Sequence, residues 1–319
     1  MHFDVFNGDA DGIIALVQLR LAEPKQSTLV TGVKRDINLV AKIPVDEASS
    51  ATVLDVSMEK NAEALSRLLA NDIEVFYVDH HRAGDIPQVN NLTAIIDTDA
   101  NTCTSLLVNQ YLKGQYVNWA IAAAYGDNMI ASADTLADQQ GLTEQQKSQL
   151  KAFGIYINYN GYGRSVDDLH FSPQTLFHKL VQYPDPLTII TEEDSVFHQL
   201  ESAYQTDMQQ ASQAKVVAES STCKVVELPD EPWARRVSGV FGNQLANQSP
   251  DKAHAVLTIN VDKSYTVSLR APLANKQGAG DICAQFPTGG GRAAAAGVNQ
   301  LPADMVEQFI AAVSDYYQA

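Results

Sequence analysis

Cysteine is scarce in this chain of 319 residues, which holds only Cys103, Cys223 and Cys283. These cysteines stand far apart, and no two of them form a Cys-x-x-Cys motif. A zinc ribbon or a disulfide framework needs several closely spaced cysteines, so the sequence argues against both. Unpaired cysteines are typical of a reducing compartment, and we therefore expect a cytoplasmic protein.

Long apolar runs are also missing from the sequence. No stretch approaches the roughly 20 apolar residues that a membrane-spanning helix needs. The chain begins Met-His-Phe-Asp, without the basic segment and apolar stretch of a secretory signal peptide. We therefore expect neither a membrane partner nor a cleaved leader.

Positive charge is sparse as well. Lys and Arg total 22 against 38 for Asp and Glu, which gives a formal net charge of -16. Proteins that bind long nucleic acids usually carry a basic patch or stripe, so this balance argues against such a partner. It leaves room for a short anionic substrate held by a few Arg residues and metal ions. Bound cations would also offset part of the acidity.

The first half of the sequence alternates between strand-like and helix-like segments. The expected strands cover 3–6, 28–31, 52–56, 74–78 and 94–96, and the expected helices cover 12–21, 59–69 and 104–112. Such alternation predicts an α/β fold whose parallel sheet carries helices on both faces. In sheets of this kind the ligand crevice lies beyond the carboxyl ends of the strands.

The second half predicts a separate, smaller domain. Strand-like runs at 225–228, 255–261 and 265–270 and an amphipathic helix at 301–317 indicate an α+β unit. The segment before these strands is polar and favours helix, so we expect it to connect the two domains. We therefore predict a catalytic domain at 1–190, a helical linker at 191–222 and a substrate-binding domain at 223–319.

Acidic and imidazole side chains follow the predicted strands at their carboxyl ends. Asp79, His80 and His81 come directly after the strand at 74–78, and a triplet of this kind rarely serves packing. Each other acid has an ordinary explanation as a helix cap or turn residue. Together they predict a metal cage of carboxylates and one imidazole, which suits Mn²⁺, with Mg²⁺, Co²⁺ and Zn²⁺ as competitors. The predicted ligands are Asp9, Asp11, Asp55, His80 and Asp127.

A glycine run is the strongest signal near the end of the chain. Gly289, Gly290 and Gly291 are followed by Arg292, and consecutive glycines let backbone N–H groups surround an anion. The alternative is a flexible turn before a helix of small residues at 293–297. Lys34 and Arg35 offer a weaker signal, since a charged pair in a loop is usually solvated.

Taken together, these residues resemble a known superfamily. Segment 7–12 (Asn-Gly-Asp-Ala-Asp-Gly), Asp55, the triplet at 79–81 and Asp127 resemble the motifs of the DHH phosphoesterases. Segments 268–270 and 281–286 and the glycine run through Gly297 resemble the accompanying DHHA1 domain. The resemblance covers nearly the whole chain. It implies a DHH domain and a DHHA1 domain with the active site in the cleft between them.

The resemblance also implies roles for the site residues. Asp9 would bind one of two metal ions and Asp11 the other, and Asp55 would bridge them. His80 and Asp127 would complete the second site, while Asp79 and His81 would support catalysis or face the substrate. In the DHHA1 domain, Arg270 and the glycine run would hold the substrate, and Arg292 would contact a phosphate or a guanine edge.

The sequence departs from the superfamily pattern at two places. Some members carry a His or Asp ahead of the paired aspartates, where this chain has Val5 and Asn7. The first metal site would therefore be poor in ligands, with Asn7 or water completing it. The residue after the glycines is usually His, whereas here it is Arg292, a permanent cation unsuited to proton transfer.

These features lead to a functional hypothesis. We expect a two-metal, Mn²⁺-dependent phosphodiesterase that hydrolyses short oligonucleotides, above all 5′-phosphorylated linear dinucleotides such as pGpG or pApA, to mononucleotides. One alternative is a phosphatase acting on 3′-phosphoadenosine-5′-phosphate (pAp), and another is a catalytically silent nucleotide-binding sensor. A polyphosphatase or pyrophosphatase fits the glycine-rich domain less well. The sequence leaves undecided whether the protein forms a homodimer, because no residue in it indicates a dimer interface.

Overall fold

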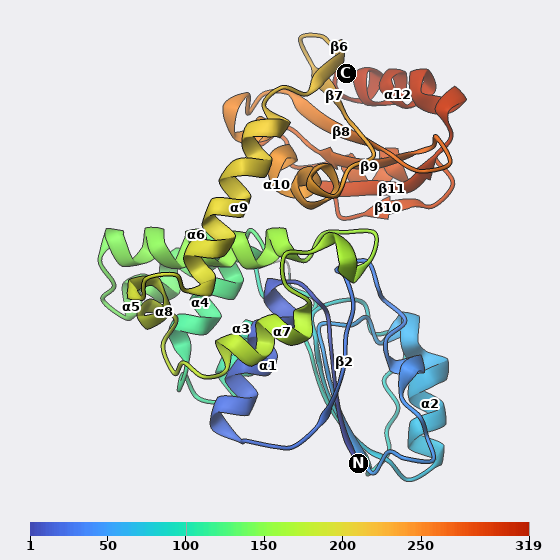
Figure 1. Cartoon of the computed structure of the whole chain (residues 1–319). Helices are drawn as coiled ribbons and strands as arrows, with labels where there is room; N and C mark the ends of the chain where they lie inside the picture. The colour runs from blue at the N-terminus through green and yellow to red at the C-terminus, as the bar shows by residue number, and fades with distance from the viewer. Residues whose placement is uncertain (100, 319) are drawn as a thin grey trace. The chain divides into compact units, whose positions relative to one another are not determined.

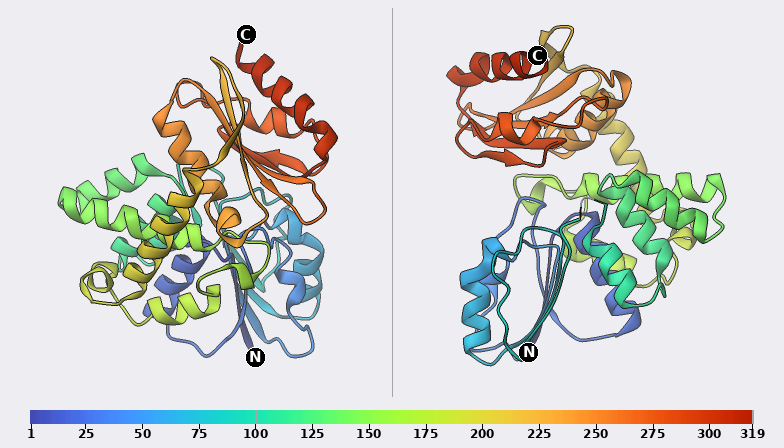
Figure 2. Two further views of the ribbon diagram at one scale, coloured as in Figure 1. Left: turned by 45° about the horizontal axis from the view of Figure 1, so that its top comes forward. Right: turned by 180° about the vertical axis from the view of Figure 1, so that it is seen from behind.

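The computed structural model describes residues 1–99 and 101–318. The chain divides into two compact units, Met1–Ala203 and Tyr204–Ala319 (Figures 1 and 2). Within the described residues, no helix is both long enough and apolar enough to cross a membrane. The fold of each unit follows from its own pattern of buried residues.

Unit 1 is built on a five-stranded parallel sheet, as predicted. Its strand order is β2-β1-β3-β4-β5. Phe6 of β1 pairs with Leu54 of β3, and Leu54 pairs with Val78 of β4, so these strands end at the same edge. The strands are β1 (His2–Phe6), β2 (Thr28–Val30), β3 (Ser50–Leu54), β4 (Glu74–Asp79) and β5 (Leu92–Ile96).

Helices cover both faces of this sheet (Figure 1). On one face, α2 (Ala62–Ala70) buries Leu65 and Leu68 against Val53 and Tyr77 of the strands. On the other face, α1 (Ala10–Ala22) is buried nearly all round, because further helices enclose it. These helices are α3 (Thr104–Tyr111), α4 (Val117–Gly126), α6 (Glu144–Asn160) and α7 (Pro173–Leu180). Unit 1 also contains α5 (Ile130–Gln139) and α8 (Pro186–Thr191), and α9 (Val196–Ala211) runs from unit 1 into unit 2.

Unit 2 contains a six-stranded mixed sheet in the order β10-β11-β9-β8-β7-β6, in which β7 and β8 are parallel. Phe309 and Val313 of α12 (Val306–Gln318) pack into the core on one face of this sheet. Arg270 reaches α10 (Pro232–Gln248) from the opposite face. The strands are β6 (Lys215–Glu219), β7 (Cys223–Leu228), β8 (Ala253–Ile259), β9 (Tyr265–Arg270), β10 (Gly289–Gly291) and β11 (Ala295–Leu301). A short helix, α11 (Ala279–Cys283), precedes the glycine run.

Two segments of the second half differ from the sequence-based expectation. The linker predicted at 191–222 is not helical throughout, because it contains β6, which pairs with β7 and belongs to the sheet. The glycine run forms β10, and segment 295–301 forms β11 rather than a helix of small residues. Gly291 pairs with Ala296, and a Cβ on Gly291 would lie 2.5 Å from the Cα of Ala296.

Candidate metal centre

Asp55 stands at the end of β3 in an unusual backbone conformation. Its φ is +58°, in the left-handed region that residues other than glycine rarely adopt. The neighbouring strand holds it there, because the Asp55 N–H donates to the carbonyl of Val78 at 3.1 Å. Strain of this kind persists where the surrounding structure fixes the residue, and it often marks functional sites. Its carboxylate is buried.

His80 faces Asp55 with Nε2, while its Nδ1 contacts a backbone carbonyl. The Nδ1 of His80 donates to the carbonyl of Thr102 at 3.1 Å, which leaves Nε2 with its lone pair toward the acids in the neutral ring. Nε2 lies 3.5 Å from Oδ1 of Asp55 and 3.9 Å from Oδ2 of Asp11. A backbone carbonyl on the far nitrogen is the usual way in which proteins orient a metal-binding histidine.

His81 is oriented by Asp79, the last residue of β4. The Nδ1 of His81 lies 2.7 Å from Oδ1 of Asp79, and its ring centroid lies 4.5 Å from that of His80. The Asp79 side chain is wholly buried, while the His81 side chain is 46% exposed. Asp79 therefore positions His81. Potential ligand atoms of Asp55, His80 and His81 all lie within 4.8 Å of one another.

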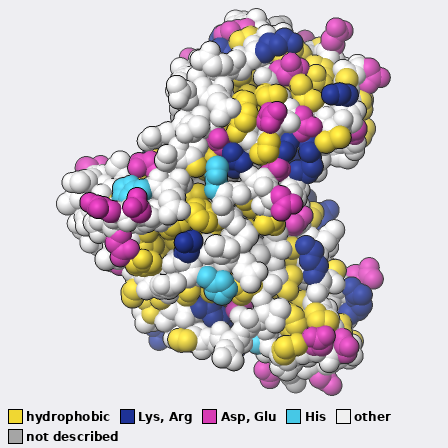
Figure 3. Space-filling view, in the orientation of Figure 1, with side chains coloured by type: hydrophobic (Ala, Val, Ile, Leu, Met, Phe, Trp, Pro, Cys, Tyr) yellow, Lys and Arg dark blue, Asp and Glu magenta, His cyan; other side chains and the backbone are white. Residues whose placement is uncertain are grey.

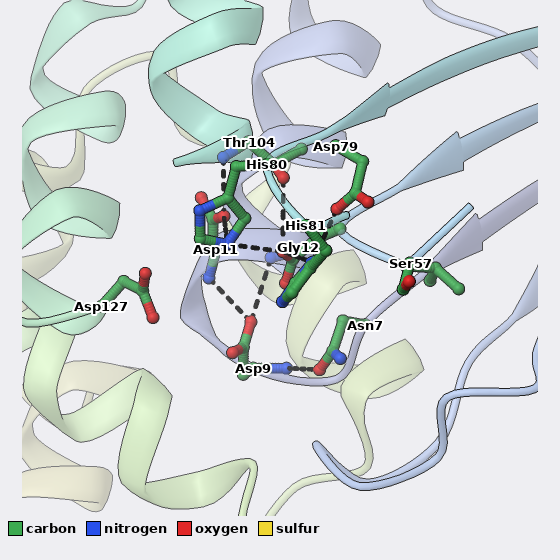
Figure 4. A network of polar contacts seen from close by, with 12 residues as sticks. Asn7, Asp9, Asp11, Gly12, Ser57, Asp79, His80, His81, Thr104 and Asp127 are labelled. Carbon is green, nitrogen blue, oxygen red and sulfur yellow. Dashed lines mark hydrogen bonds and ion pairs between the residues drawn. The ribbon is translucent and has the colours of Figure 1, made fainter. Parts of the chain in front are cut away.

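Asp11 joins this cluster through α1 and also anchors α3. Its carboxylate accepts hydrogen bonds from the N–H groups of Thr104 at 2.8 Å and Ser105 at 2.7 Å. The first turn of α3 thereby gains partners for two N–H groups that the helix itself cannot satisfy. Gly12 allows the tight turn before α1, because a Cβ there would meet the carbonyl oxygen of Asn7 at 2.4 Å. Figure 4 shows Asp9, Asp11, His80 and His81 around one space.

Asp9 is engaged on both of its carboxylate oxygens. Oδ1 caps α1 by accepting from the N–H groups of Asp11 at 3.0 Å and Gly12 at 3.1 Å. Oδ2 lies 2.5 Å from the ammonium of Lys34. Asn7 was expected to help hold a metal ion, but its side chain serves the backbone. Its Oδ1 accepts from the N–H of Asp9, and its Nδ2 donates to the carbonyl of Lys34.

Asp127 follows α4 and lies to one side of the cluster (Figure 4). Its Oδ1 is 4.0 Å from the Lys34 ammonium, which also donates to Oδ1 of Asn158 at 3.1 Å. The ring of Tyr162 lies beneath the same ammonium, 5.4 Å from its centroid. Lys34 therefore stands between two of the predicted metal ligands.

The crowding of acids shifts the pKa values of the site. Burial and the charges of Asp9 and Asp11 raise the pKa of Asp55 well above its usual range. Burial lowers the pKa of His80, but the hydrogen bond to Asp55 and the charges of Asp11, Asp55 and Asp127 outweigh it and raise that pKa to about 10. Both shifts follow from the burial of the site and the negative charge of its neighbouring acids.

The donor set fits a divalent cation. A buried carboxylate at Asp55 and an imidazole at His80, with its far nitrogen held by a carbonyl, match the ligands of Mn²⁺ and Zn²⁺. His81 and Asp11 stand next to this pair. The sequence indicated each of these residues, and the structure brings Asp11, Asp55 and His80 together as predicted.

Sequence reasoning missed the residues that surround these acids. Thr102 contributes only a carbonyl, and Thr104 and Ser105 chiefly backbone N–H groups, so their side chains gave little signal. The sequence favours a solvated Lys34, and that prediction is wrong, because its ammonium contacts Asp9 and Asn158. Tyr156 and Tyr159 are buried in the helical core.

The residues predicted to bind substrate lie in unit 2. The Arg270 guanidinium donates to Oδ1 of Asn243 at 2.5 Å and to the carbonyl of Gly239 at 3.1 Å, which ties β9 to α10. The glycine run is an edge strand, whose N–H groups alternate in direction and do not converge as the predicted anion nest requires. Arg292 is exposed.

The parallel-sheet unit with acids and imidazoles at its strand ends, followed by a smaller mixed-sheet unit, is the fold class that the sequence predicted. No family model and no curated protein sequence matches the chain. Solved structures share its fold at low identity.

Exonuclease RecJ bound to manganese is one such structure, with 16% identity and a TM-score of 0.59 over 99% of this chain and 90% of that one. A second is PggH, a pGpG-specific phosphodiesterase from Vibrio cholerae, with 14% identity and a TM-score of 0.56 over 100% and 99%. A third is an exopolyphosphatase-related protein from Bacteroides fragilis, with 14% identity and a TM-score of 0.54 over 99% and 92%.

Proposed function

We propose that this chain is a DHH-type hydrolase that uses a divalent metal ion to cleave phosphate esters of short nucleotides. The observation that carries the proposal is the convergence of Asp11, Asp55 and His80 at the ends of α1, β3 and β4. The fold shared with RecJ and PggH supports this reading. Mn²⁺ is the ion we expect to serve best, since the donor set mixes carboxylate and imidazole.

The residues of the site have distinct tasks in this proposal. Asp55 and His80 would hold the ion, with Asp11 beside them. When bound, the ion supplies a Lewis acid that neutralises charge on the phosphate and prepares a water molecule for in-line attack. Asp79 holds His81, whose exposed ring is placed to contact the leaving group or the attacking water. The fixed orientation of both rings keeps these groups ready for the transition state.

The substrate that we favour is a 5′-phosphorylated linear dinucleotide, cleaved to mononucleotides. The net charge of -16 disfavours long strands. On the face shown in Figure 3, Lys and Arg side chains are scattered among acidic and uncharged ones and form no continuous band. The fold shared with the pGpG-specific PggH favours the same class of substrate. Cleavage of pAp at its 3′-phosphate is the second candidate, because the same site chemistry would serve a monoester.

A panel of substrates tests this proposal directly. Purified protein with Mn²⁺ is incubated with pGpG, pApA, a 7-mer RNA, pAp and pyrophosphate, and the products are separated by chromatography. We expect the dinucleotides to be cleaved fastest. Preference for pAp would replace the favoured substrate, whereas saturable nucleotide binding without any turnover would identify a sensor and contradict the proposal.

The role that we propose for Arg292 in holding substrate needs its own test. Arg292→Ala should raise KM for a dinucleotide with little change in kcat, because an exposed guanidinium contributes binding and no chemistry. Arg292→Lys should restore part of the affinity. A loss confined to kcat would show that Arg292 does not act as a simple substrate contact.

A further inference from the structure

The ammonium of Lys34 is built into the site next to Asp9. Nζ lies 2.5 Å from Oδ2 of Asp9 and 3.1 Å from Oδ1 of Asn158, with the Tyr162 ring beneath it. The backbone of Lys34 is fixed on both sides. Its N–H donates to the carbonyl of Gly161 at 2.8 Å, and its carbonyl accepts from Nδ2 of Asn7 at 3.2 Å. Two polar contacts hold the ammonium and two hold the backbone, so Lys34 is not a solvated loop lysine.

Lys34 stands where a two-ion arrangement needs metal ligands. Asp9 was expected to hold one ion, but its oxygens are taken by the start of α1 and by Lys34. Asp127 was expected to hold the other ion, but its nearer oxygen lies 4.0 Å from the same ammonium. A divalent ion next to a fixed ammonium would be strongly repelled, because both are positive in a partly buried site.

The remaining ligands form one compact group. Asp55, His80 and His81 place ligand atoms within 4.8 Å of one another, and Asp11 approaches His80 within 3.9 Å. Within this group, Asp55 and His80 with Asp11 beside them suffice for one ion, with water completing its coordination. The residues of the site thus fit one divalent cation, and they do not fit the predicted second cation at Asp9.

We infer that the chain binds a single divalent ion at Asp55 and His80, and that the ammonium of Lys34 supplies at Asp9 the positive charge that a second ion would otherwise provide. This inference rests on the proposed metal-dependent function and specifies its cofactor. Lys34 has three N–H donors, and Asp9 and Asn158 use two of them. Because the side chain is 25% exposed, the third donor can bind an oxygen of the substrate phosphate.

Metal counting tests the inference on the wild-type chain. Metal-free protein is titrated with Mn²⁺ by calorimetry, and the bound ions are examined by electron paramagnetic resonance. We expect one tight ion per chain with the six-line spectrum of isolated Mn²⁺, and loss of that ion in His80→Ala. Two tight ions with an exchange-coupled spectrum, or no tight ion at all, would overturn the inference.

Removing the charge of Lys34 should have the opposite effect on metal binding and admit a second ion. Lys34→Met frees Oδ2 of Asp9, and we expect it to bind a second Mn²⁺, whereas Lys34→Arg should keep a single ion. The matched control is Lys42→Met, which removes the same charge from an exposed lysine of η1 (Val40–Lys42). A correctly folded Lys34→Met protein that still binds one ion would count against the inference.

A measurement without variants covers the case in which Lys34→Met fails to fold. Wild-type protein is acetylated with and without Mn²⁺, and the modification of each lysine is read by peptide mass spectrometry. Lys34 should stay protected in both samples. If Mn²⁺ expelled Lys34 from Asp9, its reactivity would rise toward that of Lys42, and the inference would fail.

The inference and the proposed function can fail separately. A chain that binds one ion but cleaves no phosphate ester would refute the hydrolase proposal and leave the inference in place. A chain that cleaves dinucleotides with two coupled ions would do the opposite.

Discussion

Single residues decide the chemistry of this site, and several of them have two tasks. Asp9 caps α1 and binds Lys34, while Asp11 joins the metal cluster and anchors the start of α3. For Asp11, a helix-anchoring role and a ligand role are therefore compatible. A substitution at either position would disturb a helix as well as the cluster, so Asp79 and His80 are cleaner targets for functional tests.

The link between Asp79 and His81 leads to one such test. Asp79→Asn keeps the shape and an acceptor oxygen but removes the charge that orients and polarises the imidazole. We expect Mn²⁺ affinity or kcat/KM to fall about 10-fold to 100-fold, as is usual when a partner of a metal-site histidine is changed. The exposed Asp85→Asn, in the nearby loop, serves as the control. Unchanged affinity and kcat/KM would show that His81 needs no support from Asp79.

A second buried acid, Asp4, lies on β1 away from the metal cluster and stabilises the fold. Arg20 donates to both of its oxygens, at 2.8 Å and 2.5 Å. Burial raises the pKa of Asp4, but the hydrogen bonds from Arg20 and His2 and the charge of Arg20 hold it well below its usual value. The carboxylate therefore stabilises the folded chain above the unfolded pKa of about 3.9, and this contribution is lost as the pH falls below it.

Asp4→Asn should thus lower the free energy of unfolding at pH 7 by about 3 kcal/mol, since it leaves the buried Arg20 without its counter-charge. The difference from wild type should shrink as the pH falls from 5 toward 2. Denaturant unfolding at several pH values measures both effects, with the exposed Asp46→Asn as the control. A difference that stays constant with pH would rule out the ion pair as its cause.

At the scale of elements, close helix packing sets the position of Asp127. Helices α4 and α6 cross where Gly154 meets Ala122 and Gly126. A Cβ on Gly154 would lie 1.9 Å from the carbonyl oxygen of Ala122 and 2.8 Å from the N–H nitrogen of Gly126. These atoms belong to the backbone and cannot turn aside, so the whole of α4 would have to move.

Gly154→Ala should therefore destabilise the chain, although alanine favours helices more than glycine does. We expect a loss of about 1–3 kcal/mol from overpacking. Differential scanning calorimetry measures it as a fall in Tm, with Lys151→Ala on the exposed side of the same helix as the control. Because α4 leads into Asp127, activity should also decline. A Tm equal to or above that of wild type would show that the two helices separate without cost.

At the scale of the whole molecule, the excess of acid sets the range of substrates. A net charge of -16 repels a polyanion, and each nucleotide beyond the site adds to the repulsion. A dinucleotide avoids most of it. This net charge does not determine the fold. It favours cleavage of short substrates over processive cleavage along a nucleic acid strand.

The repulsion predicts how activity depends on length and salt. The kcat/KM should fall from dinucleotide to 7-mer RNA at low ionic strength. This difference in kcat/KM should narrow as salt is raised, because salt shortens the range of the electrostatic repulsion to about 3 Å at 1 M. Steady-state kinetics with 5′-labelled oligonucleotides at several salt concentrations measures this trend. A kcat/KM that rises with length would instead indicate processive exonuclease behaviour.

The sequence by itself determined the alternation of strands and helices along the first part of unit 1 and which acids follow the ends of those elements. Strand length, burial pattern and the polar residues at strand ends all depend on residues that are adjacent in the sequence. A parallel sheet then brings the carboxyl ends of its strands to one edge. Asp55 and His80 could be predicted together for this reason.

Only the tertiary structure decided the surroundings of the acids. Lys34 meets Asp9 and Asn158 across sequence separations of 25 and 124 residues, and nothing near it in the sequence distinguishes it from a solvated loop lysine. The N–H groups of Thr104 and Ser105 carry no signal in their side chains, and the glycine run became a strand because β11 was there to pair with it. Charge balance in a buried site depends on which residues come together in three dimensions, and that is settled by packing.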